Sequence, residues 1–158
     1  MGKGQRRRWA AWAAQALLAA ALPGAAAAAD AALAGPAATA DCGPALPASS
    51  RQLIRQHGLQ LAFAPRPAPL PLGRHFALDI VVCPADGVPA PTLRAVDAEM
   101  PAHRHGMNYR PTVQALGAGR YRADGLMLHM PGAWRLWFEL DAGPGQPPLR
   151  MAHELLLR

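Results

Sequence analysis

The sequence predicts an all-β fold, an immunoglobulin-like antiparallel β-sandwich of about seven strands. Short apolar runs with a period of two recur from residue 59 to residue 158, and Gly, Pro and Asp residues separate them. No stretch in this region has the length and periodicity of a helix that could connect parallel strands. A chain of 158 residues has room for one domain behind an N-terminal segment. Another small all-β fold, such as a barrel, would show the same periodicity.

The expected strands differ in how clearly they alternate. Residues 134–140 have the cleanest pattern, with a large apolar residue at every second position. The Pro-rich stretch 65–72 is expected to be an edge or a connection, because proline donates no hydrogen bond to a sheet. Gly117-Ala118 is typical of a hairpin turn. The seven expected strands cover residues 59–64, 76–82, 93–98, 109–116, 119–128, 134–140 and 149–157.

Residues 30–58 are predicted to form an Ala/Pro-rich tether. Almost no large apolar side chain occurs before Ser49, so this part of the chain has little surface to bury. Ser49 and Ser50 could cap a short helical turn over residues 51–57, and Gly58 would end it. The sandwich is therefore expected to occupy residues 59–158.

Residues 1–29 have the layout of an export signal. A basic segment from Lys3 to Arg8 precedes an apolar run from Trp9 to Leu22, and small residues follow as far as Ala29. The alternative is an uncleaved membrane anchor, but the apolar run is shorter than the roughly 20 residues of a spanning helix. We therefore expect a periplasmic or secreted protein, or alternatively one that is anchored to the membrane by this N-terminal segment.

The charge and the motifs exclude several classes of function. The formal net charge is +6, but four of these charges belong to the expected signal, which leaves +2. We expect no nucleic-acid partner, since a basic patch interleaved with aromatic residues is not found. The sequence contains no nucleophile elbow, phosphate-binding glycine loop or haem attachment motif, so a non-enzymatic role is expected. The four charges within the expected signal come from Lys3, Arg6, Arg7 and Arg8.

Cys42 and Cys83 are the two cysteines of the chain, and they are candidates for one disulfide. Export would place them in an oxidising compartment, where such bonds persist. A thiolate copper ligand at Cys83 is the alternative. The His and Met that would closely follow the cysteine of a blue-copper site are missing.

The segment 100–111 concentrates residues that bind soft or borderline metals. It holds two histidines and two methionines, and imidazole together with thioether groups favours copper. In an extended backbone His103, His105 and Met107 would point the same way, whereas a loop could wrap the same residues around an ion. His129-Met130 is a second candidate pair, and only one of its side chains is expected to join the site, because neighbours on a strand face opposite sides. The candidate copper ligands are His103, His105, Met107, His129, Met130 and Met100.

Each candidate also has an ordinary structural interpretation. Met100 and Met130 both precede proline, and a methionine in such a place often fills a gap in the core. His103 and His105 flank Arg104 and could belong to a solvated loop.

Three motifs together resemble the YtkA-like family, which is related to the FixH-like proteins. They are Met100-Pro-x-His103-x-His105-Gly, then Gly119-x-Tyr121, then Met130-Pro-Gly132-x-Trp134, and the resemblance covers residues 72–142. It implies an immunoglobulin-like fold and an exported or membrane-anchored protein. Because the FixH-like relatives are associated with copper transport for cytochrome oxidase assembly, it also implies copper.

The sequence therefore predicts an exported sandwich that binds copper for storage or delivery, with a copper-receiving or envelope protein as its partner. The alternative is a metal-free structural or protein-interaction module of the cell envelope. Such a module would use the face around Trp137 or the Pro-rich edge.

Overall fold

The computed structural model describes residues 41–84 and 90–158. The predicted signal over residues 1–29 and the predicted tether up to residue 40 lie outside the described residues. Within the described part, no helix is both long and apolar enough to cross a membrane.

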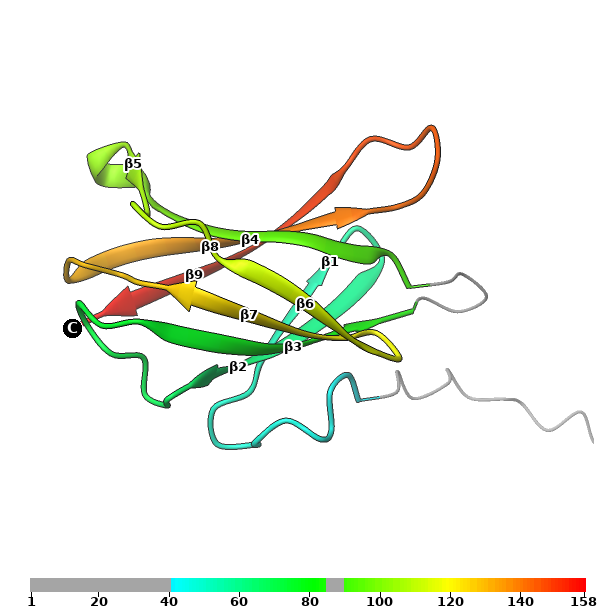
Figure 1. Cartoon of the computed structure of the whole chain (residues 1–158), viewed down its shortest axis with the longest axis horizontal. Coiled ribbons are helices and arrows are strands. Elements are labelled where there is room, and N and C mark those ends of the chain that lie inside the picture. The colour runs from blue at the N-terminus through cyan, green and yellow to red at the C-terminus, as the bar shows by residue number, and fades with distance from the viewer. Residues whose placement is uncertain (1–40, 85–89) are drawn as a thin grey trace, which may run out of the picture. The chain divides into compact units, whose positions relative to one another are not determined.

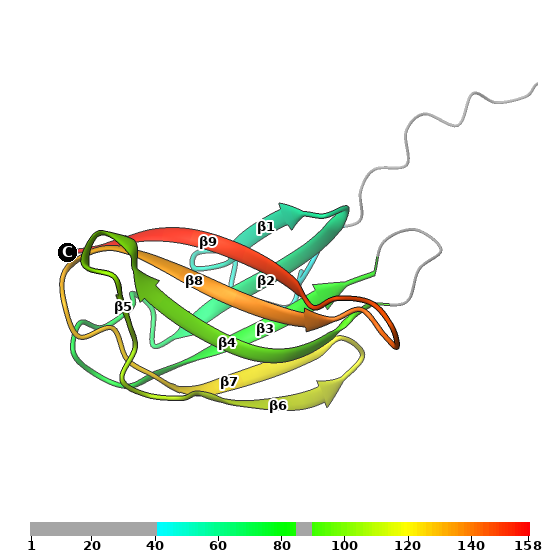
Figure 2. The same cartoon turned by 90° about the horizontal axis from the view of Figure 1, so that it is seen from above.

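Two antiparallel sheets pack face to face (Figures 1 and 2). One sheet has the order β1-β2-β3-β7-β6 and the other β5-β4-β8-β9. Seven strands remain when β1 and β5 are left out. One sheet then has the order β2-β3-β7-β6 and the other β4-β8-β9, which is the strand arrangement of an immunoglobulin domain. The predicted fold class is confirmed. The strands are β1 (Gln52–Gln56), β2 (Leu59–Arg66), β3 (Phe76–Cys83), β4 (Thr92–Met100), β5 (His105–Gly106), β6 (Thr112–Gly117), β7 (Arg120–Leu126), β8 (Gly132–Asp141) and β9 (Leu149–Leu157).

Alternating residues of both sheets form the core, as the sequence pattern predicts. In β8 every second residue from 134 to 140 is completely buried, and full burial of each such side chain stabilises the fold by roughly 1.5–3 kcal/mol. The rings of Phe63 and Phe138 join the two sheets, with centroids 5.2 Å apart.

The predicted helical turn over residues 51–57 is wrong, because Gln52–Gln56 form strand β1. β1 pairs with β2 from Gln52 opposite Phe63 to Gln56 opposite Leu59. The connecting residues His57 and Gly58 both have positive φ, 55° and 72°, as the tight turn of a two-residue hairpin requires. Seven residues are too few for a stable isolated helix, whereas the edge of β2 offers hydrogen-bond partners. The sandwich therefore begins at residue 52 instead of 59.

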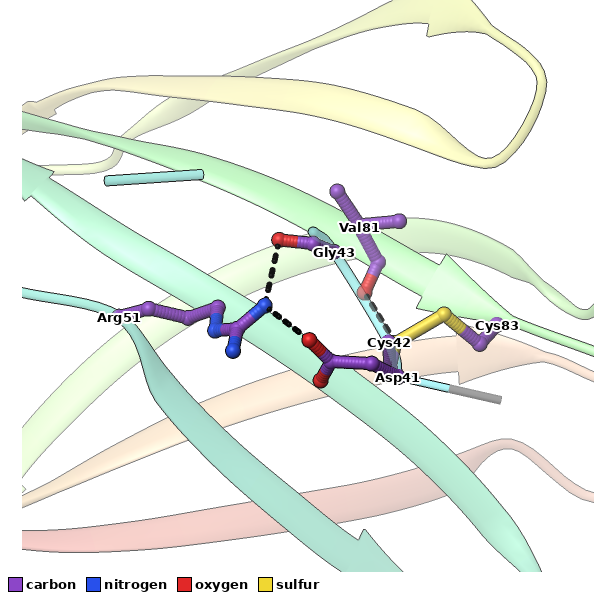
Figure 3. Close-up of a disulfide and its surroundings, with 6 residues drawn as sticks. All are labelled: Asp41, Cys42, Gly43, Arg51, Val81 and Cys83. Atoms are coloured by element: carbon purple, nitrogen blue, oxygen red, sulfur yellow. Dashed lines mark hydrogen bonds and ion pairs between the residues drawn. A yellow bond between two sulfur atoms is a disulfide. The ribbon is translucent and has the colours of Figure 1, made fainter. Parts of the chain in front are cut away.

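The described end of the predicted tether is attached to the sandwich (Figure 3). Cys42 and Cys83 form a disulfide with Cα atoms 5.9 Å apart, as predicted. Nearby, Arg51 Nη1 donates hydrogen bonds to Asp41 Oδ2 at 2.8 Å and to Gly43 O at 3.1 Å. Cys42 is 1% exposed. From residue 41 onward the chain is thus part of the folded body, although its composition is poor in large apolar residues.

Candidate metal centre

The candidate ligands lie at one end of the sandwich, in the segment from the end of β4 to the residue after β5 and in the β7–β8 connection (Figure 1). After β4 the short 3-10 helix η1 (Pro101–His103) leads to Arg104, whose φ of 53° is left-handed. This residue reverses the chain, so that β5 pairs back on β4 with His105 opposite Met100. The sequence leaves both an extended strand and a loop possible for residues 103–107, and the structure has the loop.

The three histidine rings of these connections lie next to one another. The ring centroids of His105 and His129 are 5.1 Å apart, and those of His103 and His105 are 5.9 Å apart. His103 is exposed, whereas His105 and His129 are half-buried. The expected proximity of segment 100–111 to His129 is therefore found. We call His103, His105 and His129 the histidine cluster.

Trp134 forms the inner wall of the histidine cluster. Its ring meets His105 and His129 edge-on, with centroids 5.8 Å and 5.6 Å away and interplanar angles of 77°. The indole Nε1 donates a hydrogen bond to the carbonyl oxygen of Met130 at 2.9 Å. Because Trp134 is fully buried, it gives the two half-buried rings a rigid support.

The ring nitrogens of the cluster are available as ligands. His129 Nδ1 is buried and has no hydrogen-bond partner among the described residues, and leaving a buried polar atom unsatisfied costs about 1–3 kcal/mol. His105 Nδ1 lies 3.2 Å from the carbonyl oxygen of Gly106. If Nδ1 carries the proton, it donates to that carbonyl and leaves Nε2 as a free electron-pair donor. Metal-binding histidines commonly have this arrangement.

The three candidate methionines occupy different positions. Met100 is 2% exposed and belongs to the core, and a Cβ added to Gly132 would lie 2.7 Å from its Cε. This close packing favours the core-filling interpretation of Met100. Met107 and Met130 are half-buried and pack against the core from outside. The backbone N–H of Met107 donates to Ala98 O at 3.0 Å and so extends the pairing of β5 with β4.

The distances between the ring centroids allow two histidines to share one metal ion. They favour such a two-histidine site over a three-histidine site that is already assembled. A ring nitrogen ~2.0 Å from a metal places the ring centroid about 3 Å from the metal, so two rings that share an ion have centroids at most about 6 Å apart. Both neighbouring pairs in the cluster satisfy this limit. Across residues 41–84 and 90–158, however, no three His, Cys, Asp or Glu side chains are already arranged to hold a metal ion.

Two further features lie outside the set of candidate ligands. His75 and Tyr109 form an edge-on pair with centroids 4.8 Å apart. A groove of about 570 Å³ also opens on the outer face of the β4–β8–β9 sheet and reaches His105. The sequence names the face around Trp137 as a possible interaction surface, but the groove itself depends on how Arg104 and Trp137, from separate elements, are placed. Its lining includes Asp97, Glu99, Arg104, His105, Trp137 and Glu139.

Fold and cluster together define an immunoglobulin-type β-sandwich with histidines gathered at one end. No protein-family model matches the chain, and no curated protein matches it, so the resemblance to the YtkA-like family stays a prediction. A similar solved structure is that of a DUF4426 family protein from Pseudomonas aeruginosa PAO1. It is 9% identical, covers 70% of this chain and 97% of its own, and has a TM-score of 0.47. A likeness of this size does not bear on function.

Proposed function

We propose that the protein is an exported β-sandwich that binds copper through the histidine cluster for storage or delivery. The observation that carries this proposal is the pair of His105 and His129, whose rings lie 5.1 Å apart while the buried Nδ1 of His129 has no partner among the described residues. A bound ion would give that nitrogen the partner that it lacks.

The surroundings of the pair favour copper over a harder ion. Imidazole suits both zinc and copper, whereas thioether groups select soft ions such as Cu(I). Met107 and Met130 are half-buried and lie close in sequence to the cluster, Met107 two residues after His105 and Met130 directly after His129. No thiolate competes, because Cys42 and Cys83 are joined in a disulfide.

The position of the cluster supports a role in storage or delivery. His103 is exposed, so a copper-receiving protein could approach the ion from solvent and replace a ligand. The disulfide agrees with an oxidising compartment such as the periplasm. Anchoring through the N-terminal segment would keep the same domain at the membrane surface.

A metal-free protein-interaction module is the second candidate. The groove around Trp137 favours it, because this groove combines an aromatic side chain with charged residues on an otherwise regular sheet face. In that case the β4–β5 turn would be a packed structural turn that borders the groove.

Titration of the full chain with Cu(I), Cu(II) and Zn(II) tests the proposal, with tryptophan fluorescence, to which Trp134 contributes, as one readout. Replacing His105 and His129 together by Ala should weaken copper binding at least about a hundredfold, equivalent to ~2.8 kcal/mol. The matched control is His57→Asn, which removes an imidazole outside the histidine cluster. Residue 57 has a positive φ, which asparagine tolerates. Equal copper affinity of the double variant and the wild type would refute the site, and tighter zinc binding would refute the choice of metal.

A further inference from the structure

The outer edge of β9 is already paired in part by side chains. The amide of Gln56 receives a hydrogen bond from Ala152 N at 2.8 Å and donates one to Ala152 O at 3.2 Å. His57 Nε2 lies 3.1 Å from Arg150 O. The Gln56 side chain thus stands where the peptide group of a neighbouring strand would be. This edge therefore accepts amide partners in a strand-like geometry.

The next two positions on the same edge are open. In an antiparallel strand, the N–H and C=O of alternate residues point to the same edge, so those of Glu154 and Leu156 follow Ala152 along it. Neither backbone forms a hydrogen bond on this edge with any described residue. The side chain of Glu154 is 60% exposed and Leu156 is 62% exposed, so the side chains at both positions reach solvent.

A cavity of about 560 Å³ lies beside this open edge. Its inner wall is the Phe63 ring, which the His153 ring meets edge-on with centroids 5.1 Å apart. Burial lowers the pKa of His153, so its ring is neutral at pH 7 and presents a hydrogen-bonding group without a charge. Leu155 of β9 and the Pro-rich connection close the other sides. The lining includes Ser50, Phe63, Pro69, Leu70, His153 and Leu155.

We propose that the open edge of β9 binds an extended segment of a partner protein by strand addition. The segment would pair its backbone with Glu154 and insert one aromatic side chain into the cavity. Strand addition draws its affinity from main-chain hydrogen bonds and its specificity from pockets for alternate side chains. On the outer face, the carboxylate of Glu154 already pairs with Arg135 of β8, and because its side chain is 60% exposed it can also attract a basic residue of the segment across the strand pair. The proposal does not depend on copper.

The hydrogen-bonding groups favour a peptide over a small molecule. A small aromatic ligand would fill the cavity but leave the N–H and C=O of Glu154 unpaired. A peptide group satisfies both, as the Gln56 amide does at Ala152. Binding of a peptide should therefore depend on the backbone groups at the edge of β9, whereas binding of a small aromatic molecule should not.

The probe is the peptide acetyl-Thr-Val-Lys-Tyr-Lys-Val-Thr-amide, added to the full chain without metal. Binding is measured by fluorescence anisotropy of the labelled peptide and by hydrogen exchange of the Glu154 and Leu156 amides. Two control peptides carry N-methyl groups on the odd or on the even residues, so each lacks the N–H donors of one edge. We expect the probe to bind and to protect both amides. One N-methyl peptide should bind at least about tenfold more weakly, equivalent to ~1.4 kcal/mol.

The matched protein variants are Glu154→Pro and Glu154→Gln. Proline removes the edge N–H and is tolerated in an edge strand, so it should weaken the probe at least about tenfold. Glutamine keeps the N–H and should weaken it only about twofold to threefold, through the lost charge. If the proline variant does not fold, the N-methyl peptides still decide the question. Equal binding of all three peptides, binding of free 4-methylphenol as tight as that of the probe, or no binding of the probe at about 1 mM would each overturn the proposal.

Discussion

Gly119 is a position where the fold needs the absence of a side chain. It ends the β6–β7 turn with a φ of 70°, and its carbonyl accepts a hydrogen bond from Val82 N at 2.8 Å. A Cβ at this position would lie 2.5 Å from Val82 O, which is a backbone atom that cannot rotate away. The turn is thereby held against the end of β3, next to the disulfide at Cys83.

We predict that Gly119→Ala lowers the free energy of unfolding by about 2–4 kcal/mol, through the strained φ and the forced shift of β3. Gly117→Ala is the matched control. It lies in the same turn with a φ of 83°, but nothing lies within 4 Å of its added Cβ, so about 1 kcal/mol is expected from strain alone. Urea denaturation of both variants measures the difference. Equal losses would mean that the close approach to Val82 is absent.

His153 should make stability depend on pH. Its pKa is lowered below the ordinary value, mainly by burial and against the opposing effect of Glu154. The unfolded chain therefore binds the proton more readily than the folded one. The stabilising contribution of neutral His153 is complete above about pH 6.5, the unfolded pKa, and is lost as the pH falls through the lower folded pKa.

The measurement is the free energy of unfolding at pH 7.5 and at pH 5.5, for the wild type and for His153→Gln. We expect the wild type to lose more stability on acidification than the variant, whose amide does not titrate. Other titrating groups contribute equally to both proteins. A variant with the same loss as the wild type would show that His153 is as accessible to protons when folded as when unfolded.

At the scale of single residues, the sequence predicts which side chains lie together. It predicts their geometry less well. The types and spacing of His103, His105 and His129 are enough to predict a cluster. The left-handed turn at Arg104 and the buried wall of Trp134 depend on packing between distant elements. No local pattern reports such packing.

At the scale of elements, the seven predicted strands are all present, with ends that shift by up to three residues. β6 begins at Thr112 instead of 109. Tyr109 packs against His75, and Pro111 provides no N–H for a ladder. β5 is missed because two residues have no detectable period. β1 is missed because Ser49-Ser50 imitates a helix cap, while the hairpin turn His57-Gly58 that decides the outcome lacks the usual Asn-Gly or Asp-Gly signal.

Gln56 joins the edge of one sheet to the edge of the other. Its amide makes two hydrogen bonds to Ala152, each with a net value of about 0.5–1.5 kcal/mol. We predict that Gln56→Ala lowers the free energy of unfolding by about 1–3 kcal/mol and speeds hydrogen exchange at Ala152. Gln52→Ala is the control, because Gln52 lies on the same strand, is exposed and makes no side-chain hydrogen bond to a described residue of β9. The interpretation fails if both variants are equally stable.

At the scale of the whole molecule, the alternating pattern is sufficient to predict the sandwich, because a chain with seven half-buried strands has few ways to cover its apolar faces. The alternating pattern does not show where the folded domain begins at its N-terminal end. Composition places residues 41–51 in a tether, yet a covalent bond and the contacts of Arg51 hold them to the sheet (Figure 3). A segment that is poor in large apolar side chains can thus be ordered with the help of a cross-link.

The last prediction concerns this cross-link. The disulfide joins residues 41 positions apart, and a loop of that length restricts the unfolded chain enough to stabilise the fold by about 2–4 kcal/mol. Replacing Cys42 and Cys83 together by Ser should cost that amount, and reductant should then have no further effect on the double variant while it lowers the wild type to the same level. Arg51→Ala is the control, because it keeps the disulfide and removes the ion pair to Asp41 and the hydrogen bond to Gly43 O, which together should cost about 0.5–2.5 kcal/mol. Guanidinium denaturation of the wild type and of both variants, with and without reductant, is the measurement. A wild type that is equally stable in reductant would show that the side-chain contacts of residues 41–51 hold the segment without the covalent bond.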